Sequence, residues 1–496
     1  MTSSGTVGRP PWRAAVTRGK HNRSYLDLPG VITETEPLRI AIAGAGCCGT
    51  LVAVHLLRQN QPVHIDLIDR RIAGLGLAYS TVWNQHLLNV RAARMSAFGS
   101  DPGHFLDWLR VNGQPDATPN SFAPRKVFGS YLQDILQTAV RSAGPEHRLR
   151  HQWSTATRLS HDGTEVQLSL ENGDRIAVDR VVLATGNPAP RPLKVGTGRY
   201  FNSPWDNGAL TGLDPSSAVL LLGSGLTAVD AFLALDAQGH QGPIYCLSRR
   251  GKLSHAHTIY RKLPEAFLPL EIKTARHLLR AIRVRVKDAE RQGYDWRAVV
   301  DSLRPITNQL WAGFDAAEQS RVLRHLKTWW DIHRHRTAPE IGFKLQDALA
   351  RGQLRVHPGR FKQIVAEKNS LRVEVRLRSQ EALSLNVQRL INCTGSEEDY
   401  RLVPNPLLQS LFETQRIQPN PIGKGLLTDG HGALIDAQGS PLDWLFTLGP
   451  PRVGGLFETT AVPELRIQAE ALANHLVSAP FEPVEIPVDY YMAAGI

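Results

Sequence analysis

The sequence predicts an α/β protein with two Rossmann-like dinucleotide-binding domains, the first of them interrupted by the second. Two glycine motifs carry this prediction, GAGCCG at Gly44–Gly49 and GSGLTA at Gly223–Ala228. Each motif follows an apolar run typical of a parallel strand and precedes a helical pattern. Such a turn lets backbone N–H groups approach a pyrophosphate at the start of the helix. We therefore expect the chain to bind two dinucleotides.

The first motif has the features of a site for FAD. The strand LRIAIA precedes it, and its three glycines are Gly44, Gly46 and Gly49. The next apolar run, IDLID, ends about 20 residues further on at Asp69, where an acid can accept a hydrogen bond from a ribose 2′-hydroxyl. A free 2′-hydroxyl is present in FAD, so this pattern predicts an FAD site.

The second motif has no acid at the corresponding strand end. The run IYCL is followed instead by a serine and two arginines, which can accommodate a 2′-phosphate. The pattern thus predicts NADPH rather than NADH, although Ala228 replaces the third glycine. The residues expected to hold this cofactor are Gly223, Gly225, Leu226, Ser248, Arg249 and Arg250.

The order of strand and glycine patterns predicts that the FAD domain is discontinuous. Strand-to-glycine patterns recur at VVLATG, at RLINCTG and at WLFTLGP, and the last precedes a helical segment. The second glycine motif lies between the first two. We expect a flexible basic tail at 1–37, an N-terminal FAD-binding segment at 38–195, the NAD(P)H domain at 196–386 with a helical insertion at 261–352, and a C-terminal FAD-binding segment at 387–496.

Further candidates for contact with FAD come from the ends of these patterns. Pro463 suits the first turn of a C-terminal helix, whose free N–H groups could stabilise negative charge on a reduced flavin. For the segment HLLNVRAARMS, flavin contact and ordinary packing are both open. The candidates are Asn89, Arg94, Met95, Thr185, Gly186, Gly395, Gly449, Glu458, Thr460, Ala461 and Val462.

The charge of the chain is strongly positive but unevenly placed. The 496 residues carry a net charge of +11, and residues 260–336 contain sixteen Lys or Arg against nine Asp or Glu. No nucleic-acid motif accompanies this surplus, so we expect a solvated basic face or an attraction for anionic NADPH, an acidic substrate or an acidic electron carrier, rather than nucleic-acid binding. No apolar run is long enough to span a membrane, and the N-terminus has no apolar signal segment, which favours a cytoplasmic protein.

Cysteine and histidine patterns exclude two kinds of site. The four cysteines, Cys47, Cys48, Cys246 and Cys393, form no C-x-x-C, which excludes disulfide reductase chemistry. The pairs His255/His257 and His333/His335 lack the further ligands that a metal site needs. The segment WDIHRHR at Trp330–Arg336 is expected to form a polar wall, to bind phosphate or carboxylate, or to be a solvated helix end, and Trp329 and Trp330 are expected in the core.

Across nearly the whole chain after the tail, the sequence resembles FAD/NAD(P)-binding proteins related to class B flavin monooxygenases. The resemblance is carried by segments such as GAGCCGTLVAVHLL, HLLNVRAARMSAF, GSGLTAVD, LSRRGKL, WDIHRHRTAP and FETTAVPELRIQA. It implies a flavin oxidoreductase, and some relatives are amino-acid N-oxygenases. The N-hydroxylase signature aligns with Asp179, Leu183–Gly186 and Pro192, with Asn187 in place of its tyrosine. The F-x-G-x-x-x-H motif of Baeyer–Villiger monooxygenases is absent.

These features together predict an NADPH-dependent flavin monooxygenase. Molecular oxygen would be activated as a C4a-hydroperoxide of the flavin and transferred to a small nucleophile such as an amino acid or amine. Because the cofactor supplies the reactive atoms, no catalytic side chain is assigned. Two alternatives remain open: a reductase that passes electrons to an external acceptor, and a non-catalytic redox sensor that binds both cofactors.

Overall fold

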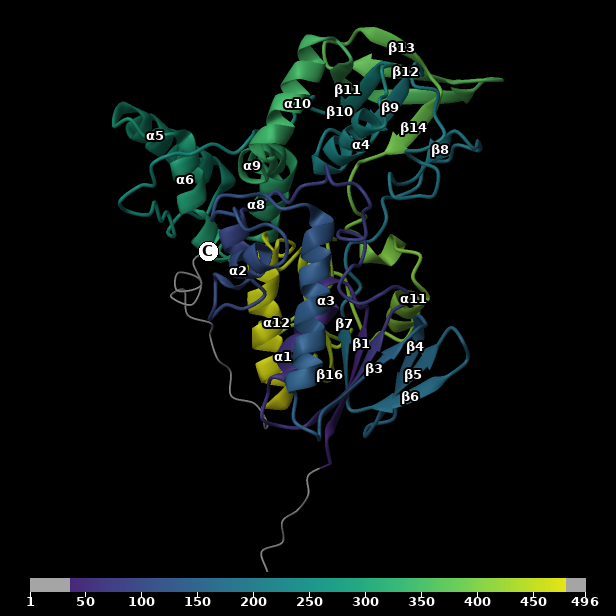
Figure 1. Ribbon diagram of the computed structural model, residues 1–496, viewed down its shortest axis with the longest axis vertical. Helices are drawn as coiled ribbons and strands as arrows, with labels where there is room; N and C mark the ends of the chain where they lie inside the picture. Colours follow the sequence, from purple (N-terminus) through teal and green to yellow (C-terminus); the bar gives the residue numbers. More distant parts are fainter. Residues whose placement is uncertain (1–35, 479–496) are drawn as a thin grey trace, which may run out of the picture. The chain divides into compact units, whose positions relative to one another are not determined.

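The computed structural model describes residues 36–478 (Figure 1). The predicted basic tail lies almost wholly outside the described residues. The chain forms two mainly parallel sheets and one small antiparallel sheet. No helix within residues 36–478 is both long enough and apolar enough to cross a membrane.

The first sheet begins at the first glycine motif and is completed by the C-terminal region of the chain. Its strand order is β15-β16-β7-β1-β2-β3, and every neighbouring pair is parallel except β15 with β16. The predicted strand at WLFTLGP is β16, which pairs with β7 and thereby with the start of the chain. The strands are β1 (Leu38–Ala43), β2 (Val63–Ile68), β3 (Arg148–Gln152), β7 (Arg180–Leu183), β15 (Ala433–Ile435) and β16 (Pro441–Thr447).

Three helices lie side by side on this sheet (Figure 1). They are α1 (Cys47–Leu57), α3 (Arg125–Ser142) and α12 (Val462–Val477), and α1 packs against both others. Helix α1 is apolar on almost every face and is buried over nearly its whole length, as expected for a helix between two others. Its side chains share one hydrophobic core with those of α12, which is how the C-terminal helix joins the first domain. A shorter helix, α2 (His104–Val111), and a 3-10 turn, η1 (Ala92–Arg94), complete this side.

A three-stranded antiparallel sheet was not expected from the sequence. It consists of β4 (Ala156–His161), β5 (Val166–Leu170) and β6 (Arg175–Val178). Helix α11 (Pro406–Glu413) packs on β4, and the contact belongs to a second core beneath the first sheet.

The second sheet is built on the second glycine motif. Its order is β13-β12-β11-β10-β9-β14-β8, and helices α4 (Leu226–Ala237) and α10 (Pro339–Ala350) share its core. The predicted hairpin is present: β11 starts parallel to β10 and continues, past a bulge, antiparallel to β12. The strands are β8 (Tyr200–Phe201), β9 (Val219–Leu222), β10 (Ile244–Ser248), β11 (Leu354–Ala366), β12 (Leu371–Leu377), β13 (Ala382–Val387) and β14 (Arg389–Asn392).

The prediction that the chain re-enters the first domain near Arg389 is wrong. Strand β14 pairs in parallel with β9 and β8, so it belongs to the second sheet. The local pattern of RLINCTG matches that of VVLATG, and a local pattern does not specify which sheet a strand joins. The strands that do return to the first sheet are β15 and β16.

The predicted helical insertion at 261–352 is helical, and no strand occurs within it. Helix α8 continues through the π-helical segment η3 (Val322–Leu326) into α9, and such segments are frequent at functional sites. The 3-10 turn η2 (Arg304–Ile306) lies between α6 and α7. The helices are α5 (Ala275–Arg291), α6 (Trp296–Ser302), α7 (Thr307–Ala312), α8 (Ala316–Arg321), α9 (Lys327–Arg334) and α10.

Candidate functional site

The first glycine turn has the geometry that a pyrophosphate requires. A Cβ on Gly44 would lie 2.3 Å from the carbonyl oxygen of Ala184, and Gly44 has a φ of +112°. A Cβ on Gly49 would lie 1.9 Å from the carbonyl oxygen of Gly44. Both positions therefore require glycine. The N–H groups of Gly46 and Cys47, at the start of α1, have no acceptor among the described residues, so a ligand could use them.

Asp69 and Thr185 flank this turn. The carboxylate of Asp69 accepts hydrogen bonds from the N–H groups of Ala45 and Arg71, both at 2.9 Å. Asp69 thus braces the turn, and its position at the end of β2 is the predicted one. Thr185 follows β7, beside Gly44, and its buried Oγ1 has no hydrogen-bond partner. An orphaned hydroxyl next to a glycine cradle fits a bound dinucleotide, and Gly186 continues the same turn with a φ of +68°.

The start of α12 is joined to the first glycine turn at Gly449. Gly449 has a φ of +73°, and a Cβ on it would lie 2.8 Å from Sγ of Cys48 and 2.9 Å from Cδ2 of Leu465, so a larger residue would be strained and would press on both α1 and α12. The N–H groups of Thr460, Ala461 and Val462 have no hydrogen-bond acceptor among the described residues. These N–H groups and the helix dipole make the end of α12 suited to negative charge.

The second glycine turn repeats this geometry in the second sheet. A Cβ on Gly223 would lie 2.2 Å from the carbonyl oxygen of Cys393, and the N–H groups of Gly225 and Leu226 have no acceptor among the described residues. Gly395 follows β14 beside this turn. Its expected place in the FAD half is therefore corrected to the second sheet, for the reason given for β14.

The serine and the two arginines after β10 have different surroundings. Ser248 Oγ accepts hydrogen bonds from Ser224 Oγ at 2.8 Å and from the N–H of Gly251 at 3.0 Å, so it holds the turn together. Arg250 donates to the carbonyl oxygen of Arg324 at 3.0 Å, in the π-helical segment. Arg249 is exposed, and none of the described residues bonds to its side chain. Arg249 is thus the arginine with donors available for a 2′-phosphate.

A buried ion pair connects the first domain to the second nucleotide helix. Arg125, at the start of α3, lies 2.8 Å from the carboxylate of Asp230 in α4, whose side chain is 4% exposed. Nε2 of His86 lies 2.9 Å from the carbonyl oxygen of Asp230. Burial lowers the pKa of His86, so the ring is neutral at pH 7 and donates this bond. Sequence reasoning missed this connection, whose signal was an acid in the middle of a mostly apolar helix.

The candidates in the segment HLLNVRAARMS separate in the structure. Met95 is 1% exposed and lies in the first core, as the packing interpretation predicts. The carbonyl oxygen of Asn89 accepts a hydrogen bond from Nε2 of His257 at 3.0 Å. Arg94 is half-buried, and its guanidinium makes no hydrogen bond or ion pair with a described residue. Burial lowers the pKa of Arg94, while the nearby charge of Asp301 opposes that shift.

Arg94 belongs to a group of buried charges that we call the arginine cluster. Arg304 donates two hydrogen bonds to Glu464, at 3.1 and 3.0 Å, and its side chain is 4% exposed. Arg336 donates two hydrogen bonds to Asp301, at 3.1 and 2.8 Å. The cluster thus combines the helical insertion with the first turn of α12. Its members are Arg94, Arg304, Arg334, Arg336, Asp301, Glu458 and Glu464.

Glu458 is the carboxylate through which the loop before α12 enters the arginine cluster. It accepts a hydrogen bond from Nε1 of Trp330 at 2.6 Å, and its own N–H donates to Oδ1 of Asn308 at 2.9 Å. Burial alone would raise the pKa of Glu458, but the charge of Arg334 and the hydrogen bond from Trp330 outweigh burial and lower it to about 2. Its carboxylate is therefore ionised and faces the helical insertion.

The contacts of the other side chains in and around the WDIHRHR segment agree with the predicted polar wall. The rings of His255 and His333 lie 4.8 Å apart between their centroids and both contact Trp296. Trp329 is 41% exposed, so its predicted place in the core is wrong. It lies instead at the second cofactor turn, where the Arg250 guanidinium is 5.9 Å from the centre of its ring. Between residues 36 and 478, no three His, Cys, Asp or Glu side chains form a metal-binding group.

All four cysteines are free thiols; three are buried, and Cys47, at the start of α1, is partly buried. Burial raises the pKa of Cys48 and of Cys246 to about 12, and it also raises the pKa of Cys47 and Cys393. Thiols with raised pKa values are poor nucleophiles. The cysteines therefore serve packing.

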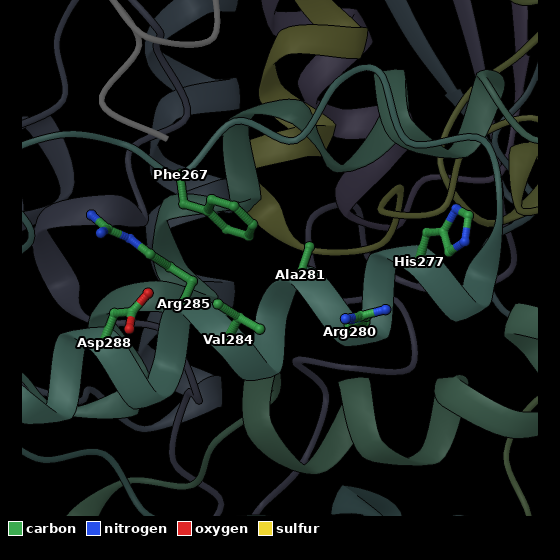
Figure 2. Close-up of a pocket in the computed structure, with 7 residues that line it drawn as sticks. All are labelled: Phe267, His277, Arg280, Ala281, Val284, Arg285 and Asp288. Atoms are coloured by element: carbon green, nitrogen blue, oxygen red, sulfur yellow. The ribbon is translucent and has the colours of Figure 1, made fainter.

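A pocket lies on the surface of α5. None of the residues that line it belongs to either glycine turn. Figure 2 shows that it is formed by one face of α5 together with Phe267. Apolar Ala281 and Val284 lie between basic Arg280 and Arg285. Val284 is 52% exposed, so α5 presents a basic surface with an apolar centre.

Comparison with known proteins first defines the class. Residues 41–188 match the family model described as FAD-NAD(P)-binding. This range contains the first glycine turn, Asp69 and Thr185. This region of the chain is therefore an FAD/NAD(P)-binding domain.

Particular relatives then narrow the comparison. The chain is 27% identical over 254 residues to an L-aspartate N-monooxygenase (nitrosuccinate-forming) from Streptomyces cremeus, a match that covers 41% of this chain and 38% of that protein. The match spans less than half of the relative.

Two solved structures share the fold. The ornithine N-hydroxylase from Kutzneria sp. 744, with reduced FAD, NADP⁺ and L-ornithine, has a TM-score of 0.60 and 14% identity and covers 89% of this chain and 99% of that chain. The L-lysine 6-monooxygenase from Pseudomonas syringae has a TM-score of 0.59 and 18% identity and covers 88% of this chain and 98% of that chain. The chain therefore shares the fold of these proteins.

Proposed function

We propose that this protein is an FAD- and NADPH-dependent monooxygenase that oxygenates the amine of a small amino acid or amine. The observation that carries the proposal is the pair of glycine turns, each with free N–H groups, one completed by the start of α12 and the other by Arg249. The likeness to an L-aspartate N-monooxygenase and to ornithine and lysine hydroxylases supports the amine as the target.

In this proposal each turn holds one cofactor. Gly44–Gly49, Asp69, Thr185 and the N–H groups of Thr460–Val462 hold FAD, and Gly223–Leu226 with Arg249 hold NADPH. When bound, FAD supplies the two-electron chemistry and the reaction with oxygen. The protein's own task is to orient the rings and substrate and to exclude water.

The arginine cluster forms the wall of the site that faces the helical insertion. Arg304 and Arg336 each donate two hydrogen bonds to a carboxylate, so the wall is rigid where it meets α12. The ring of His257 is neutral at pH 7, since burial lowers its pKa to about 4, and it holds the backbone at Asn89. None of these groups needs to act as an acid or base for the proposed reaction. Their tasks are to position and to exclude water.

The test is a visible spectrum of the purified protein, followed through addition of NADPH and then of air, with NADH in parallel. We expect flavin absorbance that bleaches faster with NADPH than with NADH and a hydroxylated amine after air is admitted. A flavoprotein that oxidises NADPH but oxygenates no amine would exclude the monooxygenase. Tight binding of both cofactors without NADPH oxidation would indicate the redox sensor instead.

The basic surface of α5 favours one alternative, a reductase that passes electrons to an acidic carrier protein. Arg276, Arg280, Arg283 and Lys287 are exposed on this helix. Arg280 also lines the pocket, beside Ala281 and Val284 (Figure 2). Attraction between such a surface and an acidic partner weakens with salt. Carrier reduction that falls steeply with ionic strength, and falls again when Arg280 and Arg283 are replaced by Gln, would support this alternative.

A further inference from the structure

The arginine cluster contains more positive than negative charge. Arg304 is matched by Glu464 and Arg336 by Asp301, each through two hydrogen bonds. The third carboxylate, Glu458, is the only acid of the cluster left for both Arg94 and Arg334. The cluster therefore lacks one negative charge.

The two arginines left over also have unused hydrogen-bond donors. The Arg334 side chain is 9% exposed, and its Nε and Nη2 are buried without a hydrogen-bond partner. The nearest carboxylate oxygens, of Glu464 and Glu458, lie 3.7 and 3.9 Å from Nη2, beyond hydrogen-bond distance. A buried donor without an acceptor costs about 1–3 kcal/mol or more. Such a group is expected where a ligand brings the acceptor.

The position of the cluster connects these donors to the candidate flavin site. Glu458 lies two residues before the segment with free N–H groups at the start of α12, and Glu464 lies in the first turn of that helix. Arg94 reaches the cluster from a different segment, the 3-10 turn η1. This turn closely follows Asn89, whose carbonyl oxygen accepts the hydrogen bond from the neutral His257. The unused donors thus belong to the same wall as the proposed reaction centre.

We propose that Arg94 and Arg334 bind a side-chain carboxylate of the substrate, so that the enzyme acts on dicarboxylic amino acids and not on basic ones. This inference rests on the proposed function. A guanidinium presents paired donors that match a carboxylate, and one carboxylate supplies the missing negative charge. A substrate with a cationic side chain would instead add a further positive charge to a buried site that already has one in excess, which is strongly unfavourable.

The test measures binding to the FAD-loaded protein in the absence of NADPH, so that no turnover is needed. Calorimetric titration uses succinate, a dicarboxylate without an amine, and 1,4-diaminobutane, a diamine without a carboxylate. We expect succinate to bind and the diamine not to bind. Arg94→Gln, which removes no ion pair, should weaken succinate binding about tenfold or more, because charge-assisted hydrogen bonds are lost.

A second variant tests the same carboxylate site independently of Arg94→Gln, in case that substitution alters succinate binding indirectly. Arg334→Lys retains the charge beside Glu458 and Glu464 but loses the paired donors, and it should also weaken succinate binding about tenfold. Arg283→Gln, an exposed arginine on α5, is the matched control and should leave succinate binding unchanged. Thermal unfolding of each variant verifies that it is folded.

Three results would overturn the inference: binding of the diamine as tight as that of succinate, no binding of either, or succinate binding that neither variant alters. If instead both variants lose FAD while succinate binding persists, the arginines hold the flavin and the inference fails. The proposed function can fail separately. If the wild-type protein binds succinate but NADPH does not reduce its flavin, the protein is not the proposed monooxygenase.

Discussion

At the scale of single residues, the structure distinguishes two adjacent arginines that look alike in the sequence. Arg250 is committed to a backbone carbonyl of the π-helical segment, while Arg249 is exposed and has no bonded partner among residues 36–478. A 2′-phosphate gains most from a cation whose donors are free. The discrimination between NADPH and NADH should therefore depend on Arg249.

We expect Arg249→Ala to raise the KM for NADPH about tenfold, because one charge-assisted contact at an exposed site is lost. The KM for NADH should stay nearly unchanged. Arg250→Ala is the matched neighbour and should alter the two KM values by similar factors. Steady-state flavin reduction with both nucleotides measures the effect. Equal losses for NADH and NADPH in Arg249→Ala would contradict the assignment of the 2′-phosphate.

Residue patterns also explain which features of the site could be predicted. The glycine turns and Asp69 were predictable because steric and hydrogen-bonding requirements act within one βαβ unit. The arginine cluster was not, because its members come from three segments that only tertiary packing brings together. The WDIHRHR segment did suggest carboxylate binding, but nothing in the sequence indicated that Glu458 and Glu464 would face it.

At the scale of elements, the assignment of strands to sheets was the part of the fold that was hardest to predict from the sequence. Strands β7 and β14 have the same local pattern, an apolar strand followed by a glycine turn, yet they lie in different sheets. The antiparallel sheet of β4, β5 and β6 was missed for a related reason, since its short half-buried strands have few apolar residues in a row. Strand order depends on contacts between distant segments, and periodicity does not report these contacts.

Elements of the two domains are held together by the pair Arg125–Asp230, which links α3 to α4. We expect Asp230→Asn to lower the free energy of unfolding by about 3–5 kcal/mol, because it leaves the Arg125 guanidinium buried without a counter-charge. Urea unfolding measures the change. Burial raises the pKa of Asp230 above its usual value, although the charge of Arg125 opposes this shift. If Asp230 were protonated, the Asn variant would be as stable as the wild type.

A double variant provides the control for this pair. Arg125→Met combined with Asp230→Leu removes both charges and should recover most of the lost stability, since apolar replacement of a buried pair is often neutral. A double variant no more stable than Asp230→Asn would mean that packing, and not the charge pair, joins the two helices.

At the scale of the whole molecule, buried neutral histidines make stability depend on mild acid. Burial lowers the pKa of His257 to about 4 and also lowers the pKa of His86 and His335. In the unfolded chain a histidine has a pKa of about 6.5, so between about pH 6.5 and 4 the unfolded state binds more protons than the folded state. The free energy of unfolding should therefore fall as the pH falls through this window.

For His257 alone the loss should reach about 3 kcal/mol by pH 4, at 1.36 kcal/mol for each unit by which its pKa is lowered. Denaturant unfolding of the wild type and His257→Gln between pH 7 and 4 measures this term, and the variant should show the shallower dependence. His277→Gln, at an exposed position on α5, should match the wild type. Parallel pH profiles for His257→Gln and the wild type would show that His257 is not the source.

The contact of Gly449 with Cys48 and Leu465 has a consequence for how the protein is made. The pyrophosphate turn is synthesised before the second sheet, but the strand and helix that complete its site, β16 and α12, are synthesised after that sheet. The nucleotide sheet between them is finished first. FAD should therefore be captured only after α12 has left the ribosome, and a nascent chain arrested before Pro441 should remain colourless.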